Sequence, residues 1–162
     1  MQLKEFKLKD LFMVMEKNDL SSFNNFVKTY GINSCEEKDK RNLLMYSIIQ
    51  KKDVFSEELI NWGIDLNYQD KQGYSALHFA VQENNLYIVD YLLKKEVDFD
   101  IVDINGNTPL WRALFNQKKI DNNIIISLLE AGADLNKHNN HGVAPLKFIK
   151  EDATYYSYLK NK

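Results

Sequence analysis

Asp70-Lys71-Gln72-Gly73-Tyr74-Ser75-Ala76-Leu77-His78-Phe79-Ala80 is the stretch that decides the fold, because a second copy of it follows. Asp103-Ile104-Asn105-Gly106-Asn107-Thr108-Pro109-Leu110-Trp111-Arg112-Ala113 has the same pattern and begins 33 residues later. The residues after each copy also recur, with Leu92-Leu93 in one and Leu128-Leu129 in the next. Self-similarity at a fixed period of this length is typical of stacked supersecondary units. The sequence therefore predicts a repeat protein.

The repeated stretches resemble the ankyrin repeat family through two patterns. One is Asp-x-x-Gly-x-Thr-Pro-Leu-His-x-Ala, and the other is Leu-Leu-x-x-Gly-Ala-Asp, which is complete at 128–134. The period of 33 residues is also that of the ankyrin repeat. The resemblance implies an all-α ankyrin-repeat solenoid of about five helix-turn-helix units with β-hairpin finger loops.

Steps of 33 residues from Asp70 divide the chain into units. Upstream copies are degenerate, with Lys40 at the glycine position and Leu43 at the proline position. Terminal repeats drift from the pattern because they must present a polar outer face. We predict a single domain, 1–162, with an amino-terminal cap at 4–36, internal repeats at 37–69, 70–102 and 103–138, and a carboxy-terminal cap at 139–162.

The most regular unit, 70–102, predicts two short helices. Ser75 is a suitable N-cap for a helix from about Ala76 to Gln82, and a second helix starts at about Leu86. In the next unit Thr108 takes the capping position. Pro109 follows it at the first helical position, where the missing N–H costs no hydrogen bond.

The unit at 103–138 carries an insertion. Gly142 follows Gly106 by 36 residues rather than 33, so three residues have been added. They fall near 116–121, between the two predicted helices. Insertions in repeats go to loops, often on the binding face.

Composition and cysteine content bound the class of protein. The chain has 162 residues, 44% of them hydrophobic and 27% charged, which is typical of one globular domain. The single cysteine, Cys35, cannot form an internal disulfide, so we expect a cytoplasmic location. The apolar run 11–15 is too short for a leader or a membrane span, so we expect no membrane association.

The net charge of −2 is unevenly distributed. Residues 1–52 carry 10 cationic and 7 acidic side chains, 53–110 carry 3 and 11, and 111–162 carry 8 and 5. A solenoid keeps sequence neighbours together, so we expect an acidic band in the middle of the stack. Such a band disfavours nucleic acid as a ligand and suits a basic protein surface. A solvated acidic face is the equally weighted alternative.

No constellation of catalytic or metal-binding residues is present in the sequence. His138 and His141 are three residues apart, but they flank an expected finger turn and no acidic or cysteine set completes a site. The resemblance gives His78 a structural hydrogen bond. We therefore predict no enzymatic activity and no cofactor.

Binding is what the resemblance implies, because ankyrin proteins typically engage protein partners through finger tips and inner helices. Aromatic and arginine side chains carry most interface hot spots, which favours Tyr74, Trp111, Arg112 and Phe115. The predicted partner-binding residues are Arg41, Lys71, Gln72, Tyr74, Glu83, Glu96, Asp100, Asn105, Asn107, Trp111, Arg112, Phe115, Asn116 and His141.

Three of these positions depart from the repeat pattern. Trp111 replaces the usual histidine, and it either binds a partner or fills space between repeats. Asp100 stands where the other units have asparagine, and Glu96 stands where they have glycine. Departures without visible compensation are expected at functional sites, so we hypothesise that Glu96 and Asp100 face a basic partner. Arg112 also belongs to a column of equivalent positions with Tyr46, Phe79 and Phe148, for which core packing is favoured over a binding stripe.

The predicted function is protein binding that masks or tethers a partner. The stretch 106–116 resembles short bacterial ankyrin proteins that accompany secreted toxins as immunity proteins. This resemblance implies inhibition of a cognate toxin, and the acidic band suits a toxin with a basic surface. A non-inhibitory scaffold or regulator is the alternative, and we expect the free protein to be a monomer.

Overall fold

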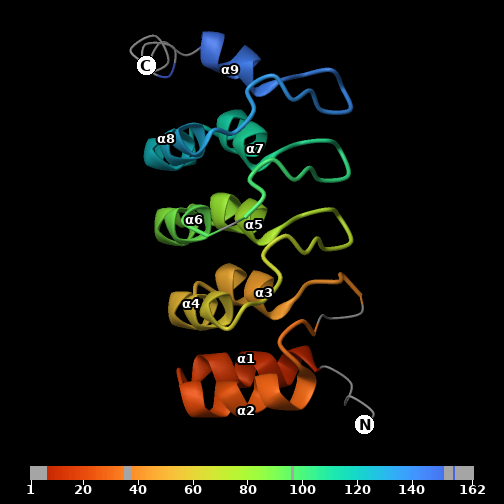
Figure 1. The fold of residues 1–162 in the computed structure, drawn as a ribbon, viewed down its shortest axis with the longest axis vertical. Helices are drawn as coiled ribbons and strands as arrows, with labels where there is room; N and C mark the ends of the chain where they lie inside the picture. The colour runs from red at the N-terminus through yellow and green to blue at the C-terminus, as the bar shows by residue number, and fades with distance from the viewer. Residues whose placement is uncertain (1–6, 35–37, 96, 152–154, 156–162) are drawn as a thin grey trace.

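The computed structural model describes residues 7–34, 38–95, 97–151 and Tyr155. Within these residues, helices stack in one column and long loops project from one edge of it (Figure 1). The helices are α1 Leu8–Glu16, α2 Leu20–Tyr30, α3 Leu43–Ile49, α4 Asp53–Asn61, α5 Ala76–Gln82, α6 Leu86–Leu93, α7 Pro109–Phe115, α8 Asn122–Ala131 and α9 Pro145–Glu151.

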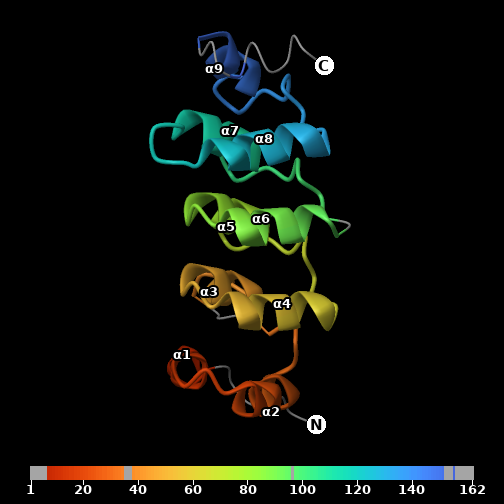
Figure 2. The ribbon, with the colours of Figure 1, turned by 90° about the vertical axis from the view of Figure 1, so that its left-hand side faces the viewer.

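The helices form two rows. The inner row is α3, α5, α7 and α9, each packed on the next, and the outer row is α4, α6 and α8. Figure 2 shows the outer row in front of the inner one. The predicted all-α repeat stack is confirmed. The finger loops, in the part of the chain that the structure describes, contain turns rather than β-strands.

The aspartate that opens each unit closes its finger. Asp70 Oδ1 accepts hydrogen bonds from the backbone N–H groups of Gln72 and Tyr74, at 2.8 and 2.9 Å. Asp103 Oδ1 does the same for the amides two and four residues later. In the last unit Asn139 Oδ1 takes this role. A short acceptor side chain is therefore needed at this position, which explains why the aspartate recurs.

Successive fingers are joined by backbone hydrogen bonds. Lys71 N–H donates to the Asp39 carbonyl at 2.9 Å and Ile104 N–H to the Gln72 carbonyl at 3.0 Å. One unit further, the amide of Asn140 donates to the preceding finger at 2.9 Å. We call this series the finger ladder.

A second series joins the loops that follow the outer helices. Asn33 Oδ1 accepts from the Asp65 amide at 3.1 Å, and Asn67 Oδ1 accepts from the next unit at 2.8 Å. Asp100 accepts from the Asp134 amide through Oδ1 at 3.1 Å. We call this series the loop ladder. The two ladders tie neighbouring units together, one through the finger loops and the other through the loops that lead from the outer helices into them.

Local capping agrees with the sequence predictions. Helix α5 runs from Ala76 to Gln82 with Ser75 as its N-cap, and α7 begins at Pro109 with Thr108 as its N-cap. His78 Nδ1 accepts from the Ser75 amide at 3.1 Å, so Nε2 carries the proton and donates to the Asn107 carbonyl at 3.1 Å. The structural hydrogen bond predicted for His78 is present, and it joins two units.

The glycines that end the outer helices have left-handed backbones, with φ of 83° at Gly63 and 97° at Gly132. A residue with a side chain adopts the left-handed conformation only at a cost, which explains why glycine stands at this position. Glu96, the equivalent residue of the middle unit, lies outside the described residues, as does Cys35.

Candidate protein-binding surface

The finger loops and the exposed positions of the inner helices make one continuous side of the stack (Figure 1). We call this side the finger face. Four predicted site residues lie exposed on finger loops: Lys71, Gln72, Asn105 and His141. Ile104, next to Asn105, is 57% exposed and adds an apolar group to its finger.

Asn107 does not join these residues. Its side chain is 5% exposed, donates to Asp103, and accepts from Asn139 Nδ2 at 2.8 Å. The prediction of an exposed finger-tip residue at this position is wrong. The side chain is used within the fingers instead, because it bonds to Asp103 of its own finger and to Asn139 of the next finger.

Arg41, Phe79, Tyr74 and Arg112 form a stack across three units. The Arg41 guanidinium lies 5.1 Å from the centroid of the Phe79 ring, and that ring lies 5.4 Å from the Tyr74 ring. The Arg112 guanidinium lies 4.4 Å from the centroid of the Tyr74 ring. Cation–π contacts of this kind contribute about 0.5–1 kcal/mol at exposed sites and more when water is excluded. Three predicted binding residues, Arg41, Tyr74 and Arg112, therefore pack units together.

Each arginine of this stack is held by a finger aspartate. Arg41 Nε donates to Asp70 at 3.3 Å, and Arg112 Nε donates to Asp103 at 2.7 Å, with a second bond from Nη2. Burial on its own would raise the pKa of Asp103, but bonds from the Asn107 amide and Arg112 lower it below its usual value. Burial raises the pKa of Tyr74. The stack is thus fixed in place before any partner arrives.

Trp111 replaces the histidine and makes the same kind of contact. Its Nε1 donates to the Val143 carbonyl at 3.1 Å, the position in the next finger that corresponds to the acceptor of His78. The ring is half-buried and bonded to the next unit. Of the two alternatives, this contact supports the one in which Trp111 fills space between repeats. Its remaining surface faces a neighbouring aromatic residue.

That neighbour is Phe115, which is 61% exposed at the end of α7. The Trp111 and Phe115 rings are stacked, with centroids 5.0 Å apart and an angle of 16°. Phe148 meets both rings edge-on, at 5.5 and 6.1 Å. We call these three residues the aromatic cluster. It holds the most exposed large hydrophobic side chain among the described residues on a rigid base.

A hollow of about 220 Å³ is lined in part by the residues that follow Trp111 and Phe115 in the sequence. Asn116 and Arg112 line it from the α7 side. Asn116, which is exposed, donates from Nδ2 to the Arg112 carbonyl at 3.2 Å. The remaining lining residues are Val81, Gln82, Lys119 and Ile120. Sequence reasoning missed Lys119 and Ile120, although the insertion at 116–121 that carries them was the available signal. Figure 2 shows the α7–α8 connection protruding beyond the corresponding connections below it.

Glu83 and Asp100 are placed by contacts within the stack. Glu83 Oε2 lies 4.0 Å from Lys51 Nζ at the edge of the finger face. Asp100 belongs to the loop ladder and also accepts, through its backbone carbonyl, from Lys137 at 2.7 Å. The Asp100 carboxylate thus replaces the asparagine acceptor of the other units, a structural contact that the sequence did not reveal, and the hypothesis that Asp100 faces a basic partner stays a prediction. Burial raises its pKa.

The acidic residues of 53–110 are not gathered on the finger face. Glu57, Glu58 and Asp90 lie on the outer helices α4 and α6, and Asp65 and Asp98 lie in the loops that follow these helices. The aspartates of the fingers are buried and bonded to backbone amides. Among the described acidic residues of 53–110, those on α4 and α6 therefore lie outside the finger face, while Glu83 lies at its edge.

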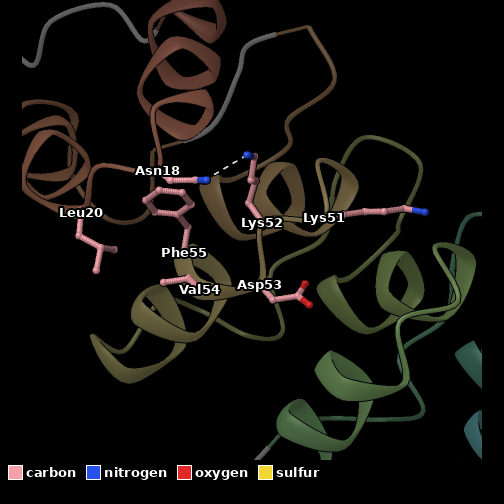
Figure 3. Close-up of a pocket in the computed structure, with 7 residues that line it drawn as sticks. All are labelled: Asn18, Leu20, Lys51, Lys52, Asp53, Val54 and Phe55. Atoms are coloured by element: carbon pink, nitrogen blue, oxygen red, sulfur yellow. Dashed lines mark hydrogen bonds between the residues drawn. The ribbon is translucent and has the colours of Figure 1, made fainter.

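A larger pocket, of about 450 Å³, lies between the first two units (Figure 3). Leu20, Val54 and Phe55 give it an apolar side. Lys52 Nζ donates to Asn18 Oδ1 at 3.1 Å across its edge, as the dashed line in Figure 3 shows. None of the predicted site residues lines this pocket.

The described residues contain neither a metal site nor a membrane-spanning helix. Among the described residues, no group of three or more His, Cys, Asp and Glu side chains could hold a metal ion. Over the same residues, every helix is too short or too polar to cross a lipid bilayer.

Two rows of short helices, projecting fingers closed by a leading aspartate, and a histidine bond between units define a class of tandem-repeat binding proteins. Residues 11–103 and 57–139 match the family described as ankyrin repeats (3 copies). These matches cover most of the chain, which belongs to the ankyrin repeat family.

Similar proteins come from bacteria, viruses and eukaryotes. A putative ankyrin repeat protein of Borreliella burgdorferi is 28% identical over 145 residues, which is 88% of this chain and 34% of that protein. One from Acanthamoeba polyphaga mimivirus is 38% identical over 73 residues, 45% of this chain and 10% of that protein. One from Rickettsia bellii is 30% identical over 95 residues, 57% of this chain and 27% of that protein. The chain thus spans about a third or less of the length of these relatives.

Proposed function

We propose that the protein binds another protein through its finger face, with the aromatic cluster as the centre of the contact. The exposed ring of Phe115, held by Trp111 and Phe148, is the observation that carries this proposal. Aromatic anchors with few rotatable bonds lose little conformational entropy on binding, so they contribute strongly to interfaces. The exposed finger residues around it supply polar contacts at the rim.

Masking of the partner is the mode of action that we propose. A rigid stack covers a broad surface without having to fold on binding, which suits occlusion of a partner's working surface. The specific form is an immunity protein that neutralises a cognate bacterial toxin, and the support for it is the likeness of 106–116 to such proteins. A cytoplasmic scaffold that tethers its partner without inhibiting it is the alternative.

A pair of photo-crosslinking variants tests the binding surface. p-Benzoylphenylalanine at position 115 should capture a specific protein in the native cell. The same group at Tyr87, which is 51% exposed on the outer helix α6, should not capture that protein. Equal capture from both positions, or capture from position 87 alone, would refute a partner site on the finger face.

Inhibition is tested with the captured partner. The partner's activity is measured with the wild-type protein and with Phe115→Ala, using Tyr87→Ala as the matched exposed-aromatic control. We expect Phe115→Ala to weaken the complex by about 2 kcal/mol, as for an interface hot spot. The affinity of Tyr87→Ala for the partner should equal that of the wild type. Loss of partner activity on binding supports masking, and full activity in the complex supports tethering.

A further inference from the structure

The hollow beside the aromatic cluster differs in charge from a similar hollow on the outer row. Both Arg112 and Lys119 line the first one, and no acidic residue does. The second hollow, of about 210 Å³, lies between α6 and α8. It is lined by Asp90, Leu93, Lys94, Ser127, Glu130 and Ala131, two acids and one cation.

We propose that the hollow on the finger face binds an acidic segment of the partner protein, with an apolar side chain seated inside and a carboxylate over Lys119. This proposal rests on the proposed function and assigns the chemistry of the partner. The partner segment is thus acidic, the opposite of the basic partner expected from the sequence, because the lining of this hollow has two cations and no acid.

The apolar part of the hollow is supplied by Val81 and Ile120. At about 220 Å³ the hollow is smaller than the pockets that hold drug-sized molecules, so one amino-acid side chain suits it better. Phe115 is the residue before Asn116, which lines the hollow. An apolar side chain that enters the hollow would bury surface against Val81 and Ile120.

The polar part favours a carboxylate. Arg112 is already bonded to Asp103, while Lys119 is exposed and its ammonium has no ion pair within the described part of the chain. Gln82 and Asn116 add side-chain amide donors at the edge. A nucleic-acid backbone would need a row of free cations, whereas a single carboxylate is matched by one lysine and neighbouring amides.

Two small probes on the full chain test this assignment. N-acetyl-L-phenylalanine carries a carboxylate, and its primary amide has the same ring and no charge. Titration followed by ¹H–¹⁵N NMR should shift the amides of 81–82 and 116–120. The carboxylate should bind at least about threefold more tightly than the amide at low salt, and this preference should shrink in about 0.5 M NaCl.

Matched variants locate the charge. Lys119→Gln should remove the preference for the carboxylate and keep binding of the amide probe. Lys94→Gln, in the outer hollow, should leave both affinities unchanged. Equal affinity of the two probes for the wild type, no binding of either, or shifts centred on 90–94 and 127–131 would overturn the assignment. Such a result leaves the crosslinking test at position 115 to decide the proposed function separately.

Discussion

At the scale of single residues, positions that looked like departures from the repeat turn out to preserve its contacts. Trp111 donates to the same carbonyl position that His78 reaches in the preceding unit. Asp100 accepts an amide as Asn67 does. A substitution in one unit can only be judged against the atoms of the next unit, and these are 29 to 34 residues away in the chain.

His78 makes stability depend on pH. Burial lowers its pKa from 6.5 to about 4, so the folded protein keeps it neutral where the unfolded chain takes up a proton. Its stabilising contribution is therefore complete above pH 6.5 and is lost as pH falls from 6.5 toward 4. The loss should reach about 3 kcal/mol, from 1.36 kcal/mol per pKa unit.

Urea unfolding at pH 7, 6, 5 and 4 measures this loss. His78→Gln is the control, since glutamine can also close a capping box with Ser75 and does not titrate. The variant should be less stable than the wild type at pH 7 and should lose less stability on acidification. Parallel curves for the two proteins would show that His78 does not titrate differently on unfolding.

Asp100 offers a second test at this scale. Asp100→Asn keeps an acceptor for the Asp134 amide and removes a partly buried charge whose pKa is raised, so stability at pH 7 should be unchanged or higher. Asp100→Ala removes the acceptor and should cost about 1 kcal/mol or more. Thermal unfolding of both variants measures the difference. If alanine and asparagine were equivalent, the loop ladder would contribute nothing at this rung.

At the scale of elements, the fingers depend on close approach between neighbouring units. Gly73 has φ of 76°, and a Cβ there would lie 2.9 Å from Asp103 Cα and from the Ile104 nitrogen, both backbone atoms. Gly132 also has a left-handed backbone, but a Cβ there would meet nothing within 4 Å. The two glycines thus separate backbone strain from crowding.

Alanine substitutions exploit this pair. Gly132→Ala should cost about 1 kcal/mol, the price of a side chain in the left-handed region. Gly73→Ala should cost about 2–4 kcal/mol, because backbone of the next finger must also move. Denaturant unfolding gives both values. Equal losses would mean that the finger ladder yields freely at Gly73.

The elements themselves followed from local sequence more directly than the surface did. Ser75, Thr108 and Pro109 predicted the starts of α5 and α7 because capping is decided within a few residues. Asn107 was misplaced because its partners, Asp103 and Asn139, belong to two different fingers. The hollow at Lys119 could not be predicted, since it forms only where the inserted loop meets the preceding inner helix.

At the scale of the whole molecule, stability is shared between neighbouring units. Removal of residues 139–162 would take away Phe148, the buried side chain of Ile149 and the carbonyl that Trp111 contacts. The end of α7 would then be uncovered, and repeat proteins require a capping unit for solubility. We expect the truncated chain to aggregate, as measured by sedimentation, or to unfold at a clearly lower temperature. A soluble monomer with undiminished helical circular dichroism per residue in α1–α8 would contradict this.

The finger ladder and the loop ladder also determine which insertions the stack can accommodate. Both are built from bonds that recur once per unit. After a tandem duplication of 70–102, the first and last residues of each copy would therefore face the same donors and acceptors as in the present chain. A shorter insertion preserves these bonds only if it lies between the bonded positions, as the three residues added between α7 and α8 do. Lengthening by whole units adds new recognition surface to the array, while the short insertion reshapes one existing site. The size of the binding surface and the shape of one site on it can therefore change independently of each other.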